Sequence, residues 1–282
     1  GRERGSMKRL CPTHLSLFTG IGGLDLAAEW AGFRTVGQCE WAEYPTRVLE
    51  KHWPDVPRWR DIRTLTKEDF YARTGLRTVD CISGGFPCQP HSVAGKRKAS
   101  GDERDLWPEM RRVIGEIEPE WVVAENVRGL LSSEAGRFFR GVLRDFAALG
   151  YAVGWCVIRA SDAGAVHRRE RVAIVAHADR QSVQRVRSYD GEEILRTKNA
   201  CPSEWDAAFR VSEQSGDTGG RFYAWNDEPV KPLVTRADDG FSGAMDRNRC
   251  LGNAVVPQQF YPVFDAIRKE MEEENEGIQG IQ

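Results

Sequence analysis

Several features that define whole classes of protein are absent from this sequence. It has no run of about 18 apolar residues, the length that a membrane-spanning helix needs, and its N-terminus lacks the apolar segment of a secretory signal peptide. No two of its seven cysteines lie closer than seven positions, so a CxxC zinc knuckle is excluded. The cysteines are scattered and odd in number, which is typical of a reducing compartment. We therefore expect a soluble cytoplasmic protein with no membrane segment and no metal site.

An excess of charge of one sign is also missing. The 282 residues include 40 Lys plus Arg and 42 Asp plus Glu, a formal net charge of −2. This balance excludes a protein that binds nucleic acid through bulk positive charge. Hydrophobic residues make up 40% of the chain and aromatic residues 10%, enough to bury a sizeable core. No internal repeat is present, and the length predicts one large domain or a domain with a small lobe.

Short apolar runs alternate with helical patterns from about position 14 to 176. This alternation is typical of an α/β fold with a parallel sheet. The predicted strands cover residues 15–18, 35–38, 79–83, 121–124, 152–158 and 172–176, and the predicted helices cover 23–31, 45–52, 106–117 and 136–149. Residues 179–229 are polar and aperiodic, which predicts an insertion. The apolar pattern returns over 250–268 as a late strand or helix, and an acidic, solvated tail follows.

The first predicted strand runs into a glycine-rich turn, GIGG at 20–23, and then into a helix. Such a turn brings the backbone close to a nucleotide-like ligand at the carboxyl end of a strand. The dinucleotide pattern GxGxxG fails because Asp25 takes the place of the third glycine, which argues against NAD and FAD. Glu40 ends the next strand, where it can accept hydrogen bonds from ribose hydroxyls, and Trp41 can cover a purine face. The alternative is a tight structural turn without a ligand.

Cys88 lies on a loop shaped by glycine and proline, just after a predicted strand. A thiolate is strongly nucleophilic, and nearby cations increase the fraction of thiol that is ionised. The candidate cations in this loop are His91, Lys96, Arg97 and Lys98. Glu125 follows another predicted strand, and the carboxyl ends of parallel strands face the same cleft. A loop cysteine without chemistry and a structural glutamate are the plain alternatives.

Five short motifs occur in the order in which the cytosine-C5 DNA methyltransferases carry them, and through these motifs the sequence resembles that family. They are a cofactor loop FTGIGG at 18–23, a nucleophile loop GFPCQ at 85–89, ENV at 125–127, HRRER at 167–171 and GNAV at 252–255. HRRER is similar to the family motif QxRxR and departs from it by His167 in place of glutamine. GNAV is similar to the family motif GN(S/A)V.

The resemblance implies an α/β protein with a Rossmann-like S-adenosylmethionine-dependent methyltransferase fold and a small inserted target-recognition region. The expected organisation is a tag or leader at 1–6, a catalytic S-adenosylmethionine-binding domain at 7–178, a target-recognition region at 179–229, a C-terminal return to the catalytic domain at 230–270 and an acidic tail at 271–282. The implied S-adenosylmethionine contacts are Phe18, Gly20, Ile21, Gly23, Glu40, Trp41, Asp61, Ile62, Pro87, Leu106, Asn253 and Ala254.

The same resemblance implies a DNA (cytosine-5-)-methyltransferase with Cys88, Glu125, Arg169 and Arg171 as catalytic residues. The thiolate would add to C6 of cytosine and activate C5, Glu125 would offset charge at N3, and the arginines would donate to O2. Because C5 and C6 are buried in the duplex stack, the target base would be flipped out.

Positive charge is concentrated locally, which reconciles DNA binding with the acidic total. Residues 159–187 contain seven arginines and three acidic residues. The predicted DNA contacts are Gln89, Ser92, Lys96, Arg97, Lys98, Arg180, Arg185 and Arg187. We expect a monomer that acts on double-stranded DNA in a bacterial cell or a phage-infected host, with a cognate restriction endonuclease as a candidate partner.

Two alternatives stay open at this point. One is a tRNA cytosine-C5 methyltransferase on the same scaffold. The other is a catalytically inert DNA-binding regulator, against which the intact Cys88, Glu125 and Arg171 argue. A zinc deaminase is excluded, because no histidine has a glutamate two residues later and Cys88 has no cysteine partner at position 91.

Overall fold

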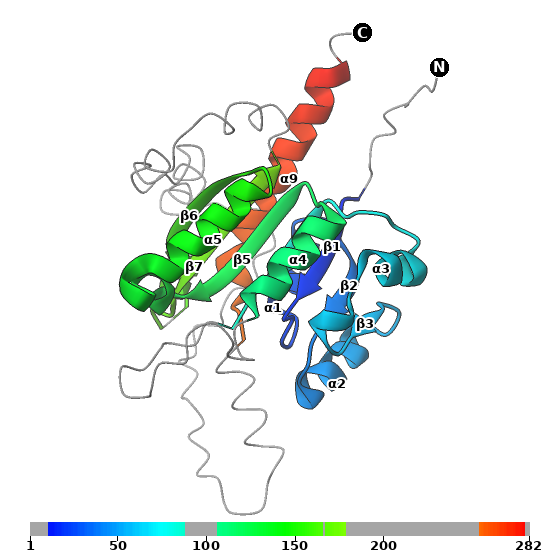
Figure 1. Ribbon diagram of the computed structural model, residues 1–282, viewed down its shortest axis with the longest axis horizontal. Coiled ribbons are helices and arrows are strands. Elements are labelled where there is room, and N and C mark those ends of the chain that lie inside the picture. The colour runs from blue at the N-terminus through cyan, green and yellow to red at the C-terminus, as the bar shows by residue number, and fades with distance from the viewer. Residues whose placement is uncertain (1–10, 88–105, 166, 179–253, 280–282) are drawn as a thin grey trace, which may run out of the picture.

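The computed structural model describes residues 11–87, 106–165, 167–178 and 254–279. Several predicted features lie outside these described residues: segment 1–6, the predicted recognition region 179–229 and, among the single residues, Cys88, Gln89, Ser92, Lys96, Arg97, Lys98, Arg180, Arg185, Arg187 and Asn253. The described residues form an α/β layered structure around one sheet (Figure 1). The predicted fold class is therefore confirmed.

Seven strands form the sheet in the order β3-β2-β1-β4-β5-β7-β6. Their bounds are β1 Thr13–Leu17, β2 Arg34–Cys39, β3 Arg58–Trp59, β4 Cys81–Gly84, β5 Trp121–Val127, β6 Tyr151–Arg159 and β7 Glu170–Ala178. Strands β1 to β5 pair in parallel, so their carboxyl ends lie along one edge of the sheet. All six predicted strands are present, and the two-residue strand β3 is an addition.

The prediction of a parallel sheet is wrong for one strand, because β7 runs antiparallel to both β5 and β6. The reason is the connection between β6 and β7, residues 160–169, which contains only the short 3-10 helix η3, Ala160–Ala163. A parallel pair needs a crossover of about a dozen or more residues, usually a helix. The chain therefore returns as a hairpin, and β7 inserts between β6 and β5.

Helices cover both faces of the sheet (Figure 1). One face carries α4, Trp107–Ile117, and α5, Arg137–Ala148, and the other carries α1, Gly23–Trp30, and α9, Pro257–Gln279. The remaining helices are α2 Glu43–His52, α3 Lys67–Thr74 and the 3-10 helices η1 Ile62–Thr64 and η2 Arg128–Gly136. Side chains of a strand alternate between two faces, so Val122 and Ala124 join the α4/α5 core while Trp121 and Val123 join the α1/α9 core.

Helix α9 continues to Gln279 and so runs into the segment that was predicted as an acidic tail. Its buried apolar residues recur at intervals of three and four positions, the spacing of one helix face: Phe260, Val263, Phe264, Ile267 and Met271. This face packs on α1 in the second core cluster. The C-terminal segment therefore forms a layer of the domain and backs the helix that follows the glycine turn.

A buried polar network joins the first strands beneath that turn. Asp25, in the first turn of α1, is fully buried and accepts hydrogen bonds from Ser16 Oγ and Gln38 Nε2, both at 2.8 Å. Gln38 Oε1 in turn accepts from Arg58 Nε at 3.0 Å, which extends the network to β3. Burial raises the pKa of Asp25 to about 6, while the hydrogen bonds from Gln38 and Ser16 oppose the shift.

This network predicts how stability depends on pH. The folded-state pKa of Asp25 lies above the unfolded value of 3.8, so the native state binds the proton more tightly and the group's contribution to stability falls as pH rises from about 4 to about 6. Asp25→Asn removes the ionisation and still pairs with Ser16 and Gln38. We expect its free energy of unfolding at pH 8 to exceed that of the wild type by about 1–3 kcal/mol.

Urea unfolding at pH 4, 6 and 8 measures this difference, and Asp55→Asn, at an exposed carboxylate, is the matched control. Between pH 4 and pH 8 the Asp25→Asn variant should gain stability relative to the wild type. Equal pH profiles for the variant and the wild type would show that Asp25 does not titrate in this range.

Candidate active site

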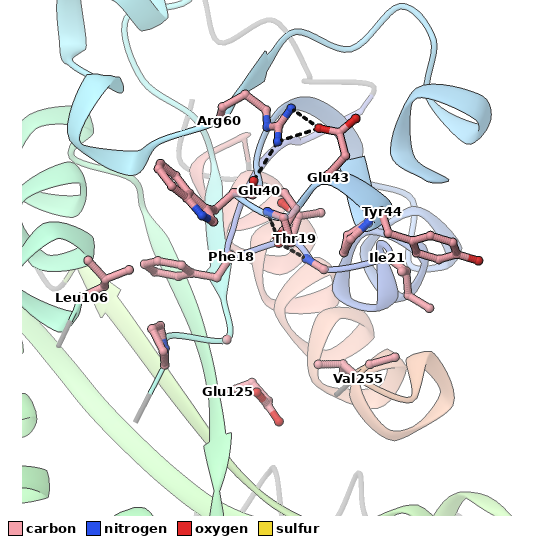
Figure 2. Close-up of a pocket in the computed structure, with 17 residues that line it drawn as sticks. Phe18, Thr19, Ile21, Glu40, Glu43, Tyr44, Arg60, Leu106, Glu125 and Val255 are labelled. Atoms are coloured by element: carbon pink, nitrogen blue, oxygen red, sulfur yellow. Dashed lines mark hydrogen bonds and ion pairs between the residues drawn. The ribbon is translucent and has the colours of Figure 1, made fainter. Parts of the chain in front are cut away.

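A cavity of about 1000 Å³ opens at the carboxyl ends of the parallel strands (Figure 2). The residues that line it follow β1, β2, β3 and β4, lie in β5, or directly precede α4 and α9. They are Phe18, Thr19, Gly20, Ile21, Glu40, Trp41, Ala42, Glu43, Tyr44, Pro45, Arg60, Gly85, Pro87, Leu106, Glu125, Ala254 and Val255. In open α/β sheets this edge is where ligands bind. The fold therefore gathers the predicted glycine turn and the predicted carboxylate around one cavity.

The glycine turn is held by the carboxylate that follows β2. Glu40 Oε2 accepts a hydrogen bond from the Gly20 N–H at 2.8 Å, and its Oε1 accepts from the Ala42 N–H at 2.7 Å. Phe18 has a φ of 50°, a left-handed conformation that costs a non-glycine residue about 1–3 kcal/mol. Such strain persists where the surroundings enforce it, commonly at binding sites. Here it points the Phe18 ring toward Leu106 across the cavity (Figure 2).

Arg60, directly after the short strand β3, holds the segment that follows β2. Both terminal nitrogens of Arg60 lie 3.1 Å from Glu43 Oε2, and one of them donates to the Trp41 carbonyl at 2.9 Å (Figure 2). The side chain of Trp41 remains largely uncovered, because the residue is 69% exposed. This arrangement leaves an aromatic ring available to a ligand in the cavity.

Glu125 lies inside β5, where Ala173 of β7 is its partner, and it is not in the loop after the strand as predicted. Its Oε1 forms an ion pair with Arg171 Nε at 2.7 Å, and both side chains are largely buried. A Cβ at Gly85 would lie 2.8 Å from Glu125 Oε2, so a larger residue there would displace this carboxylate from its present position. Burial raises the pKa of Glu125 above its ordinary value, and Arg171 and Arg169 oppose the shift.

Arg169 connects the arginine motif to the C-terminal segment. Its guanidinium donates to the carbonyl of Ala254, and its own carbonyl accepts from Gln259 Nε2 at 3.0 Å. The same Gln259 nitrogen donates to the carbonyl of Ile158 at 2.9 Å. Burial and the neighbouring Arg171 lower the pKa of Arg169. Arg169 and Arg171 thus both lie near the Glu125 carboxylate, and the C-terminal segment holds Arg169 in place.

The structure brings nine of the predicted site residues to the wall of the cavity: Phe18, Gly20, Ile21, Glu40, Trp41, Pro87, Leu106, Glu125 and Ala254. Arg171 contacts Glu125 directly, and Arg169 acts on it electrostatically. Three predicted cofactor residues do not line the cavity. Gly23 packs against the backbone just before α9. A Cβ on Gly23 would lie 2.3 Å from the Val255 carbonyl oxygen. Asp61 accepts from the Arg63 N–H at 3.0 Å, and Ile62 is buried in the core.

Sequence reasoning missed eight residues of the wall: Thr19, Ala42, Glu43, Tyr44, Pro45, Arg60, Gly85 and Val255. Most of them adjoin predicted positions, and the rule that strand ends face a ligand could have included the start of α2. Arg60 gave no such signal, because the two-residue strand that precedes it is too short to show a periodicity.

The described residues contain neither a candidate metal site nor a candidate membrane-spanning helix. No group of three or more His, Cys, Asp or Glu side chains among them is placed to hold a metal ion. No helix in this part of the chain combines the length and the apolar character needed to cross a membrane.

The sheet order, the glycine turn and the cavity together define a protein of α/β fold with a ligand site at the carboxyl edge of its parallel strands. A protein described as a DNA modification methyltransferase encoded within an E. coli prophage superposes with a TM-score of 0.52 at 25% identity, over 59% of this chain and 47% of that one. A variant of DNMT2 from Spodoptera frugiperda superposes with a TM-score of 0.51 at 20% identity, over 61% and 51% of the two chains, and supports the fold alone.

Residues 13–220 match the family of C-5 cytosine-specific DNA methylases, and the chain belongs to this family. The type II methyltransferase M.NgoMIV of Neisseria gonorrhoeae is 36% identical over 168 residues, which cover 58% of this chain and 51% of that protein. M.BsuFI of Bacillus subtilis, also a type II methyltransferase, is 34% identical over 59% of this chain and 40% of its own length. The chain thus matches about half or less of the length of these relatives. The resemblance seen in the five motifs is confirmed.

Proposed function

We propose that this protein transfers a methyl group from S-adenosylmethionine to C5 of a flipped-out cytosine in double-stranded DNA, at a specific sequence. The observation that carries the proposal is the Glu125–Arg171 pair, at 2.7 Å, beside the same cavity as the glycine turn. Membership of the C-5 cytosine-specific family and relatives that are type II methyltransferases support it. Such relatives also motivate a cognate restriction endonuclease as a candidate partner.

The residues of the cavity suit S-adenosylmethionine. Of the carboxylates on its wall, Glu43 pairs with Arg60 and Glu125 pairs with Arg171, so the Glu40 carboxylate supplies the negative charge that favours a cationic sulfonium. Each Glu40 oxygen accepts one backbone N–H and retains a second lone pair for a ribose hydroxyl. The exposed Trp41 ring can stack on adenine. When bound, S-adenosylmethionine supplies an electrophilic methyl group.

The chain's own residues would activate the cytosine. Cys88, as a thiolate, adds to C6 and forms a covalent bond, which makes C5 nucleophilic. Glu125 holds a proton at N3 and offsets the negative charge that develops on the ring, which is easier because burial raises its pKa. Arg171 orients that carboxylate and donates to O2. Once C5 carries the methyl group, a base takes the C5 proton and elimination of the Cys88 thiolate releases the product.

Recognition of the DNA sequence is assigned to residues 179–229. This segment follows the arginine motif and precedes GNAV, the place where the family resemblance puts target recognition. Arg180, Arg185 and Arg187 would contact phosphates, while the loop after Cys88 would contact the target region through Gln89, Ser92, Lys96, Arg97 and Lys98. Each good base contact provides about 1–3 kcal/mol of discrimination, so a short segment favours a short recognition site.

Transfer of labelled methyl from S-adenosylmethionine to nucleic acid tests the proposed function. We expect incorporation into duplex DNA and none into transfer RNA, and bisulfite sequencing of the product should show one recurring sequence. Exchange of residues 179–229 for the corresponding segment of a relative should change that sequence. Incorporation into transfer RNA alone would identify the RNA enzyme, and absence of any incorporation would contradict methyl transfer.

A further inference from the structure

Helix α5, Arg137–Ala148, differs in charge from the other described α-helices. It has three arginines, Arg137, Arg140 and Arg144, and one acidic residue, Asp145. Helices α2, α3 and α4 each have as many acidic as Lys and Arg residues, and α1 and α9 have more acidic ones. Among the described α-helices, α5 alone therefore has an excess of positive charge.

The three arginines lie on the face of α5 that points away from the sheet. The helix packs on the core through Phe139, Val142 and Phe146. At 100° per residue, the mean direction of the three arginines lies about 160° around the helix axis from the mean direction of those three side chains. All three are exposed. They form an arginine stripe, by which we mean Arg137, Arg140 and Arg144, that runs along the outer surface of the α4/α5 layer.

No acidic side chain among the described residues neutralises the stripe. Asp145 forms an ion pair with Arg111 at 3.4 Å and accepts from Trp107 Nε1 at 2.8 Å. Arg140 donates a hydrogen bond of 3.5 Å to the Ala135 carbonyl, which carries no formal charge. By contrast, Arg112 of α4 is flanked by Glu109 and Glu116, each at 2.9 Å. The stripe therefore presents uncompensated positive charge to solvent.

The stripe is not explained by the stability of the helix. Arg137 and Arg140 lie in its first turn, which contains no acidic residue. Positive charge at this end opposes the helix macrodipole, at a cost of about 0.3–1 kcal/mol for each exposed residue. A local arrangement that disfavours the fold is expected where a surface has a function.

We infer that the arginine stripe binds the phosphate backbone of the DNA that flanks the target site, an inference that rests on the proposed function. Arg137 and Arg144 are seven residues apart, which corresponds to about 10 Å along the helix axis. This length is about three times the axial spacing of phosphates along one DNA strand. The stripe begins near the carboxyl end of β5, because only η2 separates that strand from α5 (Figure 1). Duplex that enters the cavity edge can thus extend along this face.

The test is a salt titration of binding to a labelled duplex of arbitrary sequence, by fluorescence anisotropy, with the full chain. The glutamine variant carries Arg137→Gln, Arg140→Gln and Arg144→Gln, and the charge-matched control carries Arg34→Gln, Lys67→Gln and Arg77→Gln. We expect the glutamine variant to bind at least about tenfold more weakly at low salt. The slope of log K against log salt should fall in magnitude by about 2–3, since each neutralised phosphate contributes about 0.9. The control variant should keep the wild-type slope.

A lysine variant with Arg137→Lys, Arg140→Lys and Arg144→Lys should also keep the wild-type slope, and thermal unfolding of all variants detects loss of fold. Methyl incorporation into genomic DNA is measured in parallel. An active wild type with an unchanged slope in the glutamine variant would overturn this inference alone. A wild type that neither methylates nor binds DNA would remove the proposed function and the inference together. Weaker binding of transfer RNA with unchanged binding of duplex would make the stripe an RNA surface and overturn the DNA assignment.

Discussion

Cys88→Ala is expected to abolish methylation of DNA while binding of S-adenosylmethionine stays nearly unchanged. The proposed reaction begins with addition of the Cys88 thiolate to C6, and alanine has no nucleophile to replace it. The cofactor contacts proposed above come from other residues, so equilibrium binding of the labelled cofactor should persist. Labelled methyl transfer and equilibrium dialysis measure the two quantities separately.

Cys11→Ala is the matched control, because Cys11 is an exposed free cysteine away from the cavity wall. It should methylate DNA at the wild-type rate. A duplex with 5-fluorocytosine at the target should trap a denaturation-resistant adduct with the wild type and with Cys11→Ala, because fluorine cannot leave as the C5 proton does. Substantial turnover by Cys88→Ala would rule out the covalent mechanism.

Glu125→Gln is expected to slow the single-turnover methylation rate by about 10²–10⁴, the usual effect of removing a general acid-base group. Glutamine fills nearly the same space beside Gly85 and can still donate a hydrogen bond, but it cannot exchange a proton with N3. The neutral side chain also lacks the ion pair with Arg171. DNA affinity should change little, because the substitution acts on the chemical step.

Glu120→Gln, just before the opposite end of β5, is the control for this variant. Rapid-quench measurement of one turnover separates chemistry from product release. If the rate for Glu125→Gln equals that of the wild type, the carboxylate does not handle the proton in the reaction. A loss of DNA binding comparable to the loss of rate would instead indicate a role in holding the base.

Local patterns predicted most of the secondary structure, because strands and helices with one buried face carry their period in the sequence. These patterns failed where the length or direction of a strand depends on the strand that pairs with it. Strand β5 extends through Glu125 to Val127 because β7 pairs with it over its whole length, and β7 lies far away in the chain. The direction of β7 depends on the same tertiary arrangement. Strand β3 is held by two residues of β2, too few for a pattern.

The candidate site also has a part that the sequence predicts and a part that depends on tertiary structure. Residues at the ends of predicted strands, such as Phe18 and Glu40, could be placed at a common edge from the sequence. The distance between Glu125 and Arg171 could not, because it depends on the register of β5 and β7. The close approach of Gly85 to the Glu125 carboxylate could not be predicted either, because it depends on how β4 and β5 pair. The roles assigned to these residues stay predictions until the variants are measured.

The close approach of Gly23 to the Val255 carbonyl oxygen joins two segments that are synthesised at different times. The glycine turn is translated near the start of the chain, whereas α9, which backs it, emerges from the ribosome near the end. Until then α1 can pack on the sheet but lacks the apolar cover of α9, and a nascent chain must keep the uncovered residues from aggregating. The two halves of the pocket can meet only after residue 255 is free of the exit tunnel. A chain that stops before this point would therefore lack the part of the cavity wall that Ala254 and Val255 form.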